Sequence, residues 1–214
     1  MNTPLARFGR HAIGVAAVAV VLSAGLSGCG SDSDTPKAAS SSSSQPAASQ
    51  AAATNDKPFG NRSVPTKVSI PKLTVNAPVE QVGLADDGTV QTPALDEPNM
   101  TGWYKHGPTP GQKGPAVILG HVDSAKNGPA VFYKLRSLKK GDKITVQRKD
   151  GSSADFTVQK SKDVSKRQFP TKQVYGDIPY AGLRLITCGG AFDKSKGSYE
   201  DNIIVFAKLS GTRT

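Results

Sequence analysis

From about Val64 onward the chain is a series of short runs rich in β-branched and aromatic residues, separated by Pro, Gly and Asp. Such runs, bounded by turn-forming residues, predict strands. Several are apolar at consecutive positions, which favours burial of both strand faces in a closed barrel over an open sandwich. Helix-period segments are scarce, and only residues 131–138 predict a short helix. We therefore expect an all-β fold. The predicted strands cover residues 67–70, 116–119, 143–147, 155–159, 183–187 and 202–206.

Two Asp-Gly pairs mark turns between these runs. Asp150 and Gly151 lie between two predicted strands, an arrangement typical of a tight β-hairpin. Asp87 and Gly88 form the second turn signal. Both turns are consistent with a barrel of many short strands.

The first 28 residues predict a targeting segment. A positively charged start precedes the apolar residues 12–25, a length suited to a signal peptide but short for a membrane span. Residues 26–29, Leu-Ser-Gly-Cys, resemble a bacterial lipobox, in which the cysteine is diacylated and the signal peptide is cut just before it. We predict lipidation of Cys29, with an uncleaved N-terminal anchor as the alternative. Either arrangement holds the remaining chain at the outer face of a membrane.

A linker and one further domain follow. Residues 29–62 form the predicted linker, because the Ser-, Ala- and Gln-rich stretch 38–55 has almost no bulky apolar residues with which to form a core. Such a composition predicts a flexible tether. Residues 63–214 hold all the predicted strands and form the predicted catalytic domain.

The charge balance bears on possible partners. The chain has 27 Lys and Arg against 17 Asp and Glu, for a formal net charge of +10. A basic surface suits lipid headgroups or anionic wall polymers, although an ordinary solvated surface remains open. No recognition helix or aromatic–basic stripe accompanies the positive charge, so we expect no nucleic-acid partner.

The two cysteines and one histidine carry the chemistry. If Cys29 bears lipid, Cys188 is a lone thiol in an oxidising compartment, where an unpaired thiol is a liability unless it is buried or functional. Cys188 ends one apolar run, and His121 follows Gly120 at the end of another. A Cys and a His distant in sequence, each at a strand end, suit a thiol nucleophile with a general acid–base.

These motifs, taken in order, resemble the sortase family of cysteine transpeptidases. The resemblance spans roughly residues 64–209, and its cysteine, glycine and aromatic spacing is most similar to the class F sortases of actinobacteria. The runs that carry it are 70–73 (Ile-Pro-Lys-Leu), 120–121 (Gly-His), 132–135 (Phe-Tyr-Lys-Leu), 138–142 (Leu-Lys-Lys-Gly-Asp), 185–190 (Leu-Ile-Thr-Cys-Gly-Gly), 192–193 (Phe-Asp) and 198–199 (Ser-Tyr).

The resemblance implies a closed eight-stranded sortase-type β-barrel with one or two short helices. It implies that Cys188 attacks an LPxTG-like sorting-signal peptide, forms a thioester and passes the acyl group to an amine, such as that of a peptidoglycan precursor. It also implies a location on the outer face of the cell membrane of a Gram-positive bacterium. No metal or cofactor is expected, although some relatives bind calcium, and a monomer is expected.

The third catalytic residue departs from the family pattern. Sortases use an arginine, usually on the strand after the cysteine, and Asn202 occupies or adjoins that position here. Arg184 is the candidate instead, because it lies four residues before Cys188 on one strand and so on the same face. Its guanidinium could bind the peptide carbonyl or the developing oxyanion. Supporting roles fall to Thr187, which precedes the cysteine in the signature, to Asn202, and to Asp123, which would orient His121 or cap its loop.

Other interpretations remain open. His121 could be purely structural, and His121, Asp123 and Cys188 could form a three-ligand zinc site, although no fourth ligand or paired spacing supports it. An L,D-type cell-wall cysteine transpeptidase is the alternative enzyme. It would carry a Ser-x-Gly-Cys-like run, whereas Leu-Ile-Thr precedes Cys188. A lipoprotein that binds sorting peptides without turnover is the non-enzymatic alternative.

Overall fold

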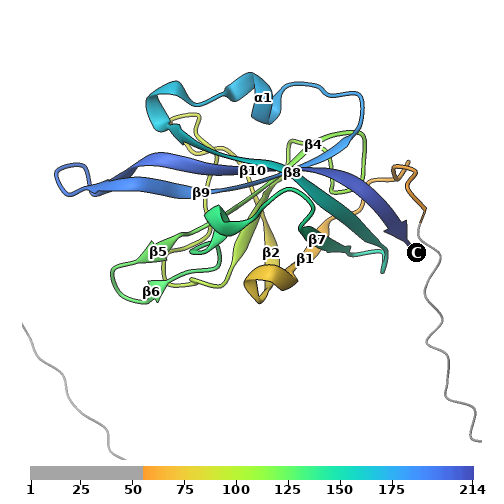
Figure 1. Ribbon diagram of the computed structural model, residues 1–214, viewed down its shortest axis with the longest axis horizontal. Coiled ribbons are helices and arrows are strands. Elements are labelled where there is room, and N and C mark those ends of the chain that lie inside the picture. Colours follow the sequence, from red (N-terminus) through yellow and green to blue (C-terminus); the bar gives the residue numbers. More distant parts are fainter. Residues whose placement is uncertain (1–54) are drawn as a thin grey trace, which may run out of the picture. The chain divides into compact units, whose positions relative to one another are not determined.

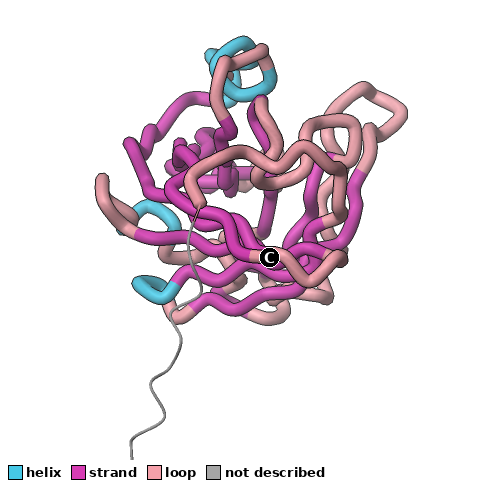
Figure 2. Tube along the Cα trace, turned by 90° about the vertical axis from the view of Figure 1, so that its right-hand side faces the viewer, coloured by secondary structure: helices cyan, strands magenta, loops and turns pink. Residues whose placement is uncertain are grey.

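A closed barrel forms the body of the protein. The computed structural model describes residues 55–214. Eight strands, hydrogen-bonded in the order β1-β2-β3-β4-β9-β10-β8-β7, close the barrel, and Figure 2 shows the ring that they form. The expected all-β, closed eight-stranded architecture is confirmed. The strands are β1 (Pro65–Ile70), β2 (Val75–Val82), β3 (Thr101–Tyr104), β4 (Gly114–Gly120), β7 (Lys143–Arg148), β8 (Ser153–Ser165), β9 (Ala181–Asp193) and β10 (Ser198–Arg213).

The strand order brings distant parts of the sequence together. Strands β4 and β9 are parallel neighbours, although four strands lie between them in the sequence. Strands β2 and β3 are the other parallel pair, and the remaining barrel contacts are antiparallel. A small two-stranded sheet, β5 (Asp123–Ser124) and β6 (Gly128–Pro129), lies in the connection after β4 (Figure 1). The ends of β4 and β9 are therefore adjacent, which is where the sequence places His121 and Cys188.

Alternate residues of each strand fill the barrel. Leu183 and Leu185 of β9 are fully buried and pack in one cluster with Ile203 and Val205 of β10. Full burial of a Leu or Val side chain contributes about 1.5–3 kcal/mol relative to leaving it exposed. The period-2 alternation of these strands thus fixes which face of β9 is interior.

A second apolar cluster covers the outer wall over β4, β9 and β10. Ile186, Ile204 and Phe206 point away from the interior and pack with Val117 and with Val174 of α1 (Thr171–Tyr175). Figure 1 shows α1 outside the barrel wall. This outer packing explains why the corresponding runs of the sequence are apolar at consecutive positions.

Helices are few, as expected. In residues 55–214, α1 is the one α-helix, and it has no helix-period pattern because it is only five residues long. The helix predicted within residues 131–138 is a series of turns that ends in the short 3-10 helix η2 (Leu135–Ser137). Two further 3-10 helices are η1 (Pro71–Leu73) and η3 (Lys166–Gln168).

Both predicted turns are confirmed. Gly151, with φ of 84°, closes the β7–β8 hairpin, where the Gly151 amide donates to the Arg148 carbonyl at 3.1 Å. Gly88, with φ of 78°, closes the other turn by donating to the Ala85 carbonyl at 2.9 Å. The left-handed φ at both positions explains why glycine follows aspartate there.

The start of the described chain lies against the barrel. Asn55 pairs with Thr212 near the end of β10, and the Phe59 amide donates to the Gly111 carbonyl at 2.9 Å. The Arg148 guanidinium lies 3.9 Å from the centre of the Phe59 ring. The predicted signal peptide, Cys29 and most of the predicted linker lie outside the described residues. Within residues 55–214, no helix is long and apolar enough to cross a membrane.

Candidate active site

His121 directly follows the last residue of β4. A Cβ on Gly120 would lie 2.7 Å from side-chain atoms of both Val131 and Phe132, so only glycine allows that segment to pack against the end of β4. The Phe132 amide donates to the His121 carbonyl at 3.0 Å. The main chain of His121 is therefore fixed by the segment that packs on Gly120.

The imidazole of His121 has a specific partner. Its Nε2 lies 2.7 Å from the carbonyl oxygen of Pro93. A carbonyl oxygen can only accept, so the geometry assigns the proton to Nε2. In the neutral ring Nδ1 is then unprotonated and is the nitrogen that can accept a proton. Pro93 thus holds His121 in one tautomer.

Cys188 and His121 lie at corresponding positions just past the last paired residues of the β4–β9 ladder. Leu119 of β4 is the partner of Ile186 of β9, and His121 and Cys188 each lie two residues further on. Neighbouring strands are about 4.8 Å apart, and residues two apart share a face. Cys188 is a free, partly exposed cysteine. The chain positions that carry the thiol and the imidazole therefore lie at the same end of two adjacent strands.

Asn202 lies directly across from Cys188 on the other side. The two residues are register partners of the antiparallel pair β9–β10. Directly opposed residues have Cβ atoms about 4.5–5.5 Å apart on one face of the sheet. The Asn202 carboxamide is therefore a hydrogen-bond donor next to the thiol.

Asp123 of β5 contacts Tyr199 of β10. The Tyr199 hydroxyl donates to Asp123 Oδ2 at 2.5 Å, and this bond links β10 to β5. The hydrogen bond to the carboxylate, together with burial and the nearby negative charges of Asp123 and Cys188, raises the pKa of Tyr199 to about 12. The polar contact of Asp123 is thus with Tyr199, in the connection that follows His121.

Thr187 faces the barrel interior. Its side chain is 4% exposed, and its Oγ1 is buried without a hydrogen-bond partner. Its register partner on β10 is Ile203. A supporting role for Thr187 near the thiol stays a prediction, and the structure adds an unpaired buried hydroxyl at this position.

The structure does not bring Arg184 together with Cys188 and His121. Arg184 is 3% exposed, its Nε donates to the Gln173 carbonyl at 3.3 Å, and its Nη1 donates to the Leu183 carbonyl at 3.2 Å. The guanidinium lies 4.8 Å from the centre of the Phe206 ring. Burial lowers the pKa of Arg184. Four residues of strand separate its Cα from that of Cys188 by about 13 Å.

A different arginine lies beside the cysteine loop. Nη2 of Arg136, in η2, is 3.5 Å from the position that a Cβ on Gly189 would take, and it forms a 2.8 Å ion pair with Asp163. No sequence pattern singles out Arg136, since it is one of several basic residues in a segment far along the chain from the cysteine.

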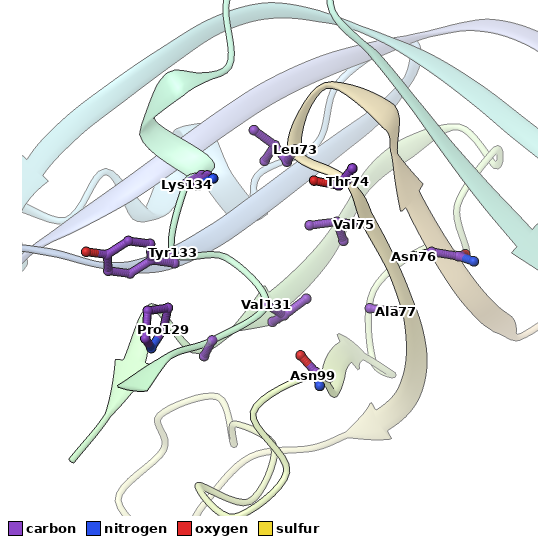
Figure 3. Close-up of a pocket in the computed structure, with 11 residues that line it drawn as sticks. Leu73, Thr74, Val75, Asn76, Ala77, Asn99, Pro129, Val131, Tyr133 and Lys134 are labelled. Carbon is purple, nitrogen blue, oxygen red and sulfur yellow. The ribbon is translucent and has the colours of Figure 1, made fainter. Parts of the chain in front are cut away.

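Two cavities adjoin the segment that follows His121. One, of about 350 Å³, is lined by Asp123, Tyr133, Phe192 and Tyr199 together with Ser124, Ala125, Gly128 and Pro129. The other, also of about 350 Å³, lies between the start of β2 and residues 129–134 and is drawn in Figure 3. Pro129 and Tyr133 line both.

The described residues offer no obvious metal site. Within residues 55–214, no three side chains of His, Cys, Asp and Glu gather in a way that could hold an ion. The thiol of Cys188 and the imidazole of His121 are carried at the same end of the neighbouring strands β9 and β4. The arrangement suits proton transfer to and from sulfur, the chemistry of a thiol nucleophile.

Comparison with known proteins agrees with this geometry. The family model of the sortase domain matches residues 68–210, which include His121 and Cys188. The chain belongs to the sortase family. Sortases are cysteine transpeptidases found outside the cytoplasm at the membrane of Gram-positive bacteria, and they act on sorting signals and amine acceptors. Among curated proteins, none matches the chain.

Solved sortases share the fold at low sequence identity. Sortase A from Corynebacterium diphtheriae is 22% identical with a TM-score of 0.52, and the match covers 70% of this chain and 62% of that one. Sortase A from Listeria monocytogenes is 18% identical with a TM-score of 0.51, covering 72% and 90%. A sortase from Actinomyces oris is 21% identical with a TM-score of 0.52, covering 77% and 88%.

The partner of His121 could not have been found from the sequence. Pro93 acts through its main-chain carbonyl, which every residue possesses, so no residue type marks it. The sequence also does not mark Tyr133 and Phe192 as site residues, because aromatic residues are ordinarily expected in the core. Each is 51% exposed in the structure, and both line the same cavity as Asp123.

Proposed function

We propose that the protein is a membrane-tethered, extracytoplasmic sortase in which Cys188 is the nucleophile and His121 is the acid–base. The observation that supports this proposal is the β4–β9 register, which brings the chain positions of His121 and Cys188 to the same end of two neighbouring strands. The proposed substrate is an LPxTG-like sorting signal, the proposed acceptor is an amine of the cell wall or of a protein, and the cell is Gram-positive. Assignment to class F rests on the spacing of Phe192 and Tyr199 after the cysteine.

In the first half-reaction, Cys188 Sγ attacks the carbonyl carbon before the scissile amide bond. The C–S bond of the thioester forms and the C–N bond breaks. The thiol proton passes by way of His121 Nδ1 to the departing amine, while Nε2 stays on the Pro93 carbonyl. The contact with Pro93 supports this assignment because it occupies Nε2 and leaves Nδ1 as the ring nitrogen that can accept a proton.

In the second half-reaction, an amine attacks the thioester carbonyl. The new C–N bond forms, the C–S bond breaks, and the amine proton passes through His121 back to the sulfur of Cys188. The same residue thus serves as acid and then as base, which suits a group whose ordinary pKa lies close to neutral pH.

The partly exposed edge of the outer apolar cluster, at Leu119, supports an approach of the sorting peptide along this face. Leu119 and Ile186 precede His121 and Cys188 by two residues each, and they pack with Phe169 and Tyr175 of the segment around α1. Apolar residues of a bound peptide would lie on the same face as the thiol. We propose that the peptide approaches Cys188 along this face.

The residue that donates a hydrogen bond to the oxyanion is Arg184 according to the sequence pattern, whereas the strand register favours Asn202. Arg184 is the candidate from strand alternation, and it would have to leave the carbonyls of Gln173 and Leu183 to reach a carbonyl on Cys188. Asn202 is already beside the thiol. Arg184 stays the predicted third catalytic residue, and separate substitution of Arg184 and Asn202 distinguishes the two candidates.

The test is turnover of a fluorogenic LPxTG-like peptide together with capture of the acyl-enzyme by mass spectrometry. We expect a thioester on Cys188, and a loss of turnover of roughly 10³-fold or more in Cys188→Ala. His121→Ala should lose nearly as much, and the two losses should not add, because the residues act as one unit.

The same measurements separate the alternatives. Cleavage of sorting peptides by Cys188→Ala would refute the thiol mechanism. Peptide binding without an acyl-enzyme would indicate a sorting-peptide-binding lipoprotein, and activity only on peptidoglycan stem peptides would indicate an L,D-type transpeptidase. Folding of each variant is checked by thermal unfolding, with Leu84→Ala, at an exposed side chain, as control.

A further inference from the structure

Two of the largest exposed apolar side chains gather at one cavity. Tyr133 and Phe192, each 51% exposed, line the 350 Å³ cavity beside Asp123. Single exposed apolar side chains are common, but exposed aromatic rings that gather at one concave place mark a candidate binding site. The cavity is also within the usual range of small-ligand pockets.

The walls of this cavity combine aromatic faces with a carboxylate. Phe192 and Tyr199 pack edge to face with ring centres 5.1 Å apart, and the Tyr199 hydroxyl donates to Asp123. Tyr133 and Pro129 line this cavity and also the neighbouring one. Figure 3 shows both side chains on one side of that neighbouring cavity. Aromatic faces and a carboxylate are the groups that bind an ammonium ion.

The carboxylate lacks a cation. Within residues 55–214, the four ion pairs involve the carboxylates of Asp150, Asp155, Asp163 and Asp193, and none involves Asp123. Its Oδ2 accepts from a neutral phenol. The charge of Asp123 is thus still free to pair with a ligand.

The residues that line the cavity are close along their strands and loops to both candidate catalytic residues. Asp123 is two residues after His121, and Tyr199 lies three residues before Asn202, which is the register partner of Cys188. A group bound between Asp123 and the rings is therefore in the neighbourhood of a thioester on Cys188.

We propose that the cavity formed by Asp123, Tyr133, Phe192 and Tyr199 binds the acceptor of the transfer reaction as a primary ammonium group. This inference rests on the proposed sortase function and specifies its second substrate. Asp123 pairs with the ammonium, and the rings of Tyr133 and Phe192 cover its carbon chain. The neighbouring cavity, which shares Pro129 and Tyr133, receives the rest of the acceptor.

Transfer from this site is balanced in protons. The bound ammonium first loses one proton to solvent, because only the free amine is nucleophilic. The amine nitrogen then forms the new amide bond, the thioester C–S bond breaks, and the second amine proton passes through His121 to the sulfur of Cys188. Asp123 keeps its charge throughout and acts by binding.

The experiment measures how the acyl-enzyme divides between aminolysis and hydrolysis at a fixed concentration of sorting peptide. This ratio does not depend on how fast the thioester forms. With Nα-acetyl-lysinamide as acceptor, we expect Asp123→Asn, Tyr133→Ala and Phe192→Ala each to lower the ratio about 3- to 10-fold, as loss of an ammonium contact implies. Leu84→Ala, at an exposed apolar side chain outside the cavity, should leave it unchanged.

Hydroxylamine is the matched acceptor, because it is a small nucleophile that is uncharged at neutral pH. The three variants should leave its ratio within about twofold of the wild-type value, since no ammonium is bound. An equal loss with hydroxylamine would show that the residues shape the site without binding charge and would overturn the proposal. An unchanged ratio with Nα-acetyl-lysinamide would overturn it as well.

A binding measurement separates this proposal from the proposed function. Titration of Cys188→Ala with Nα-acetyl-lysinamide, followed by NMR, needs no turnover. We expect shifts at the ring signals of Tyr133 and Phe192 that Asp123→Asn reduces. If these shifts occur while the wild-type protein forms no thioester, the sortase function fails and the ammonium site stands. If a thioester forms and the shifts are absent, the ammonium site fails alone.

Discussion

At the scale of single residues, the candidate hydrogen-bond donors for the oxyanion lie at different distances from the thiol of Cys188. The Asn202 carboxamide lies across the strand from Cys188, whereas the Arg184 guanidinium is held by two main-chain carbonyls further along β9. Arg136 lies near Gly189 and is paired with Asp163. A donor that stabilises an oxyanion must lie within hydrogen-bond distance of the scissile carbonyl oxygen, so position weighs more than charge.

Substitution of Arg184 and Asn202 distinguishes the two candidate donors. If Arg184 is the donor, as strand alternation predicts, Arg184→Ala lowers kcat about 10²–10³-fold and Arg184→Lys recovers part of the loss. Its burial adds a second effect, since the carbonyls of Gln173 and Leu183 would lose their donor at a cost of about 1–3 kcal/mol in stability. Activity is therefore compared per folded molecule, with thermal unfolding measured in parallel.

The opposite result would place the donor on β10. A near-wild-type kcat in folded Arg184→Ala, with a loss of 10²-fold or more in Asn202→Ala, would assign the role to Asn202. Arg213→Ala is the matched control, because Arg213 is paired with Asp155 near the end of β10, far along the strand from Asn202.

Thr187 offers a test of stability at the residue before the nucleophile. Its buried Oγ1 has no hydrogen-bond partner, and an unsatisfied buried hydroxyl costs about 1–3 kcal/mol. We expect Thr187→Val, which has the same shape, to raise the melting temperature. Thr187→Ser keeps the hydroxyl and removes a methyl group, so it should lower the melting temperature. A lower value for Thr187→Val would indicate that the hydroxyl has a partner in solution.

At the scale of elements, the sequence predicts the strands that have a regular hydrophobic pattern and misses those that do not. The runs that form β1, β7 and β8 alternate apolar and polar residues, and the runs that form β4, β9 and β10 are apolar at consecutive positions. Strand β2 contains Pro78 and mixes apolar and polar residues without a regular period, and β3 has only four residues, so neither has a clear pattern. The adjacency of β4 and β9 depends on the crossover between them, which only tertiary structure defines.

The site follows the same division. His121 and Cys188 were predicted because strand ends and residue types mark them. The hydrogen bond between Asp123 and Tyr199 joins residues that lie 76 apart in the sequence, so no local pattern could pair them. The expectation that Arg184 shares a face with Cys188 followed from alternation alone, which gives a face but not the neighbours that occupy it.

The Tyr199–Asp123 hydrogen bond ties β10 to β5, and it should make stability depend on pH. The pKa of Tyr199 is raised to about 12, so the folded state binds the phenol proton more tightly than the unfolded chain, where the pKa is about 10. The contribution is complete below pH 10 and is lost as the pH rises through 12. We expect Tyr199→Phe to melt below the wild-type protein at pH 8 and to match it near pH 12. A difference that persists above pH 12 would contradict this linkage.

At the scale of the whole molecule, the described chain enters the barrel far from the thiol. Asn55 pairs with Thr212, whereas Asn202 pairs with Cys188, so ten residues of β10 separate the two places by about 30 Å. In Figure 1 the start of the described chain lies near the C-terminus, and β5 and β6 lie at the other end of the molecule. A tether attached at Asn55 would thus leave the site open.

This separation predicts that anchoring and catalysis are independent. If Cys29 is the lipidated residue, Cys29→Ala should leave the protein unprocessed or released from the membrane, because no thiol remains to carry the acyl chains. Turnover of sorting peptide by the catalytic domain should stay at the wild-type rate, since the tether joins the barrel about 30 Å from Cys188. Membrane fractionation, mass spectrometry of the N-terminus and the peptide assay measure the three properties on one variant.

Ser27→Ala is the matched control, because it keeps a small residue within the lipobox-like run and leaves Cys29 in place. It should be processed and retained at the membrane like the wild-type protein. An intact, unmodified Met1 in the membrane fraction would rule out lipidation at Cys29 and leave the uncleaved anchor standing, because apolar residues 12–25 would then hold the chain there. Loss of peptide turnover in Cys29→Ala would instead show that the site depends on the tether, against the separation of Asn55 from Cys188 along β10.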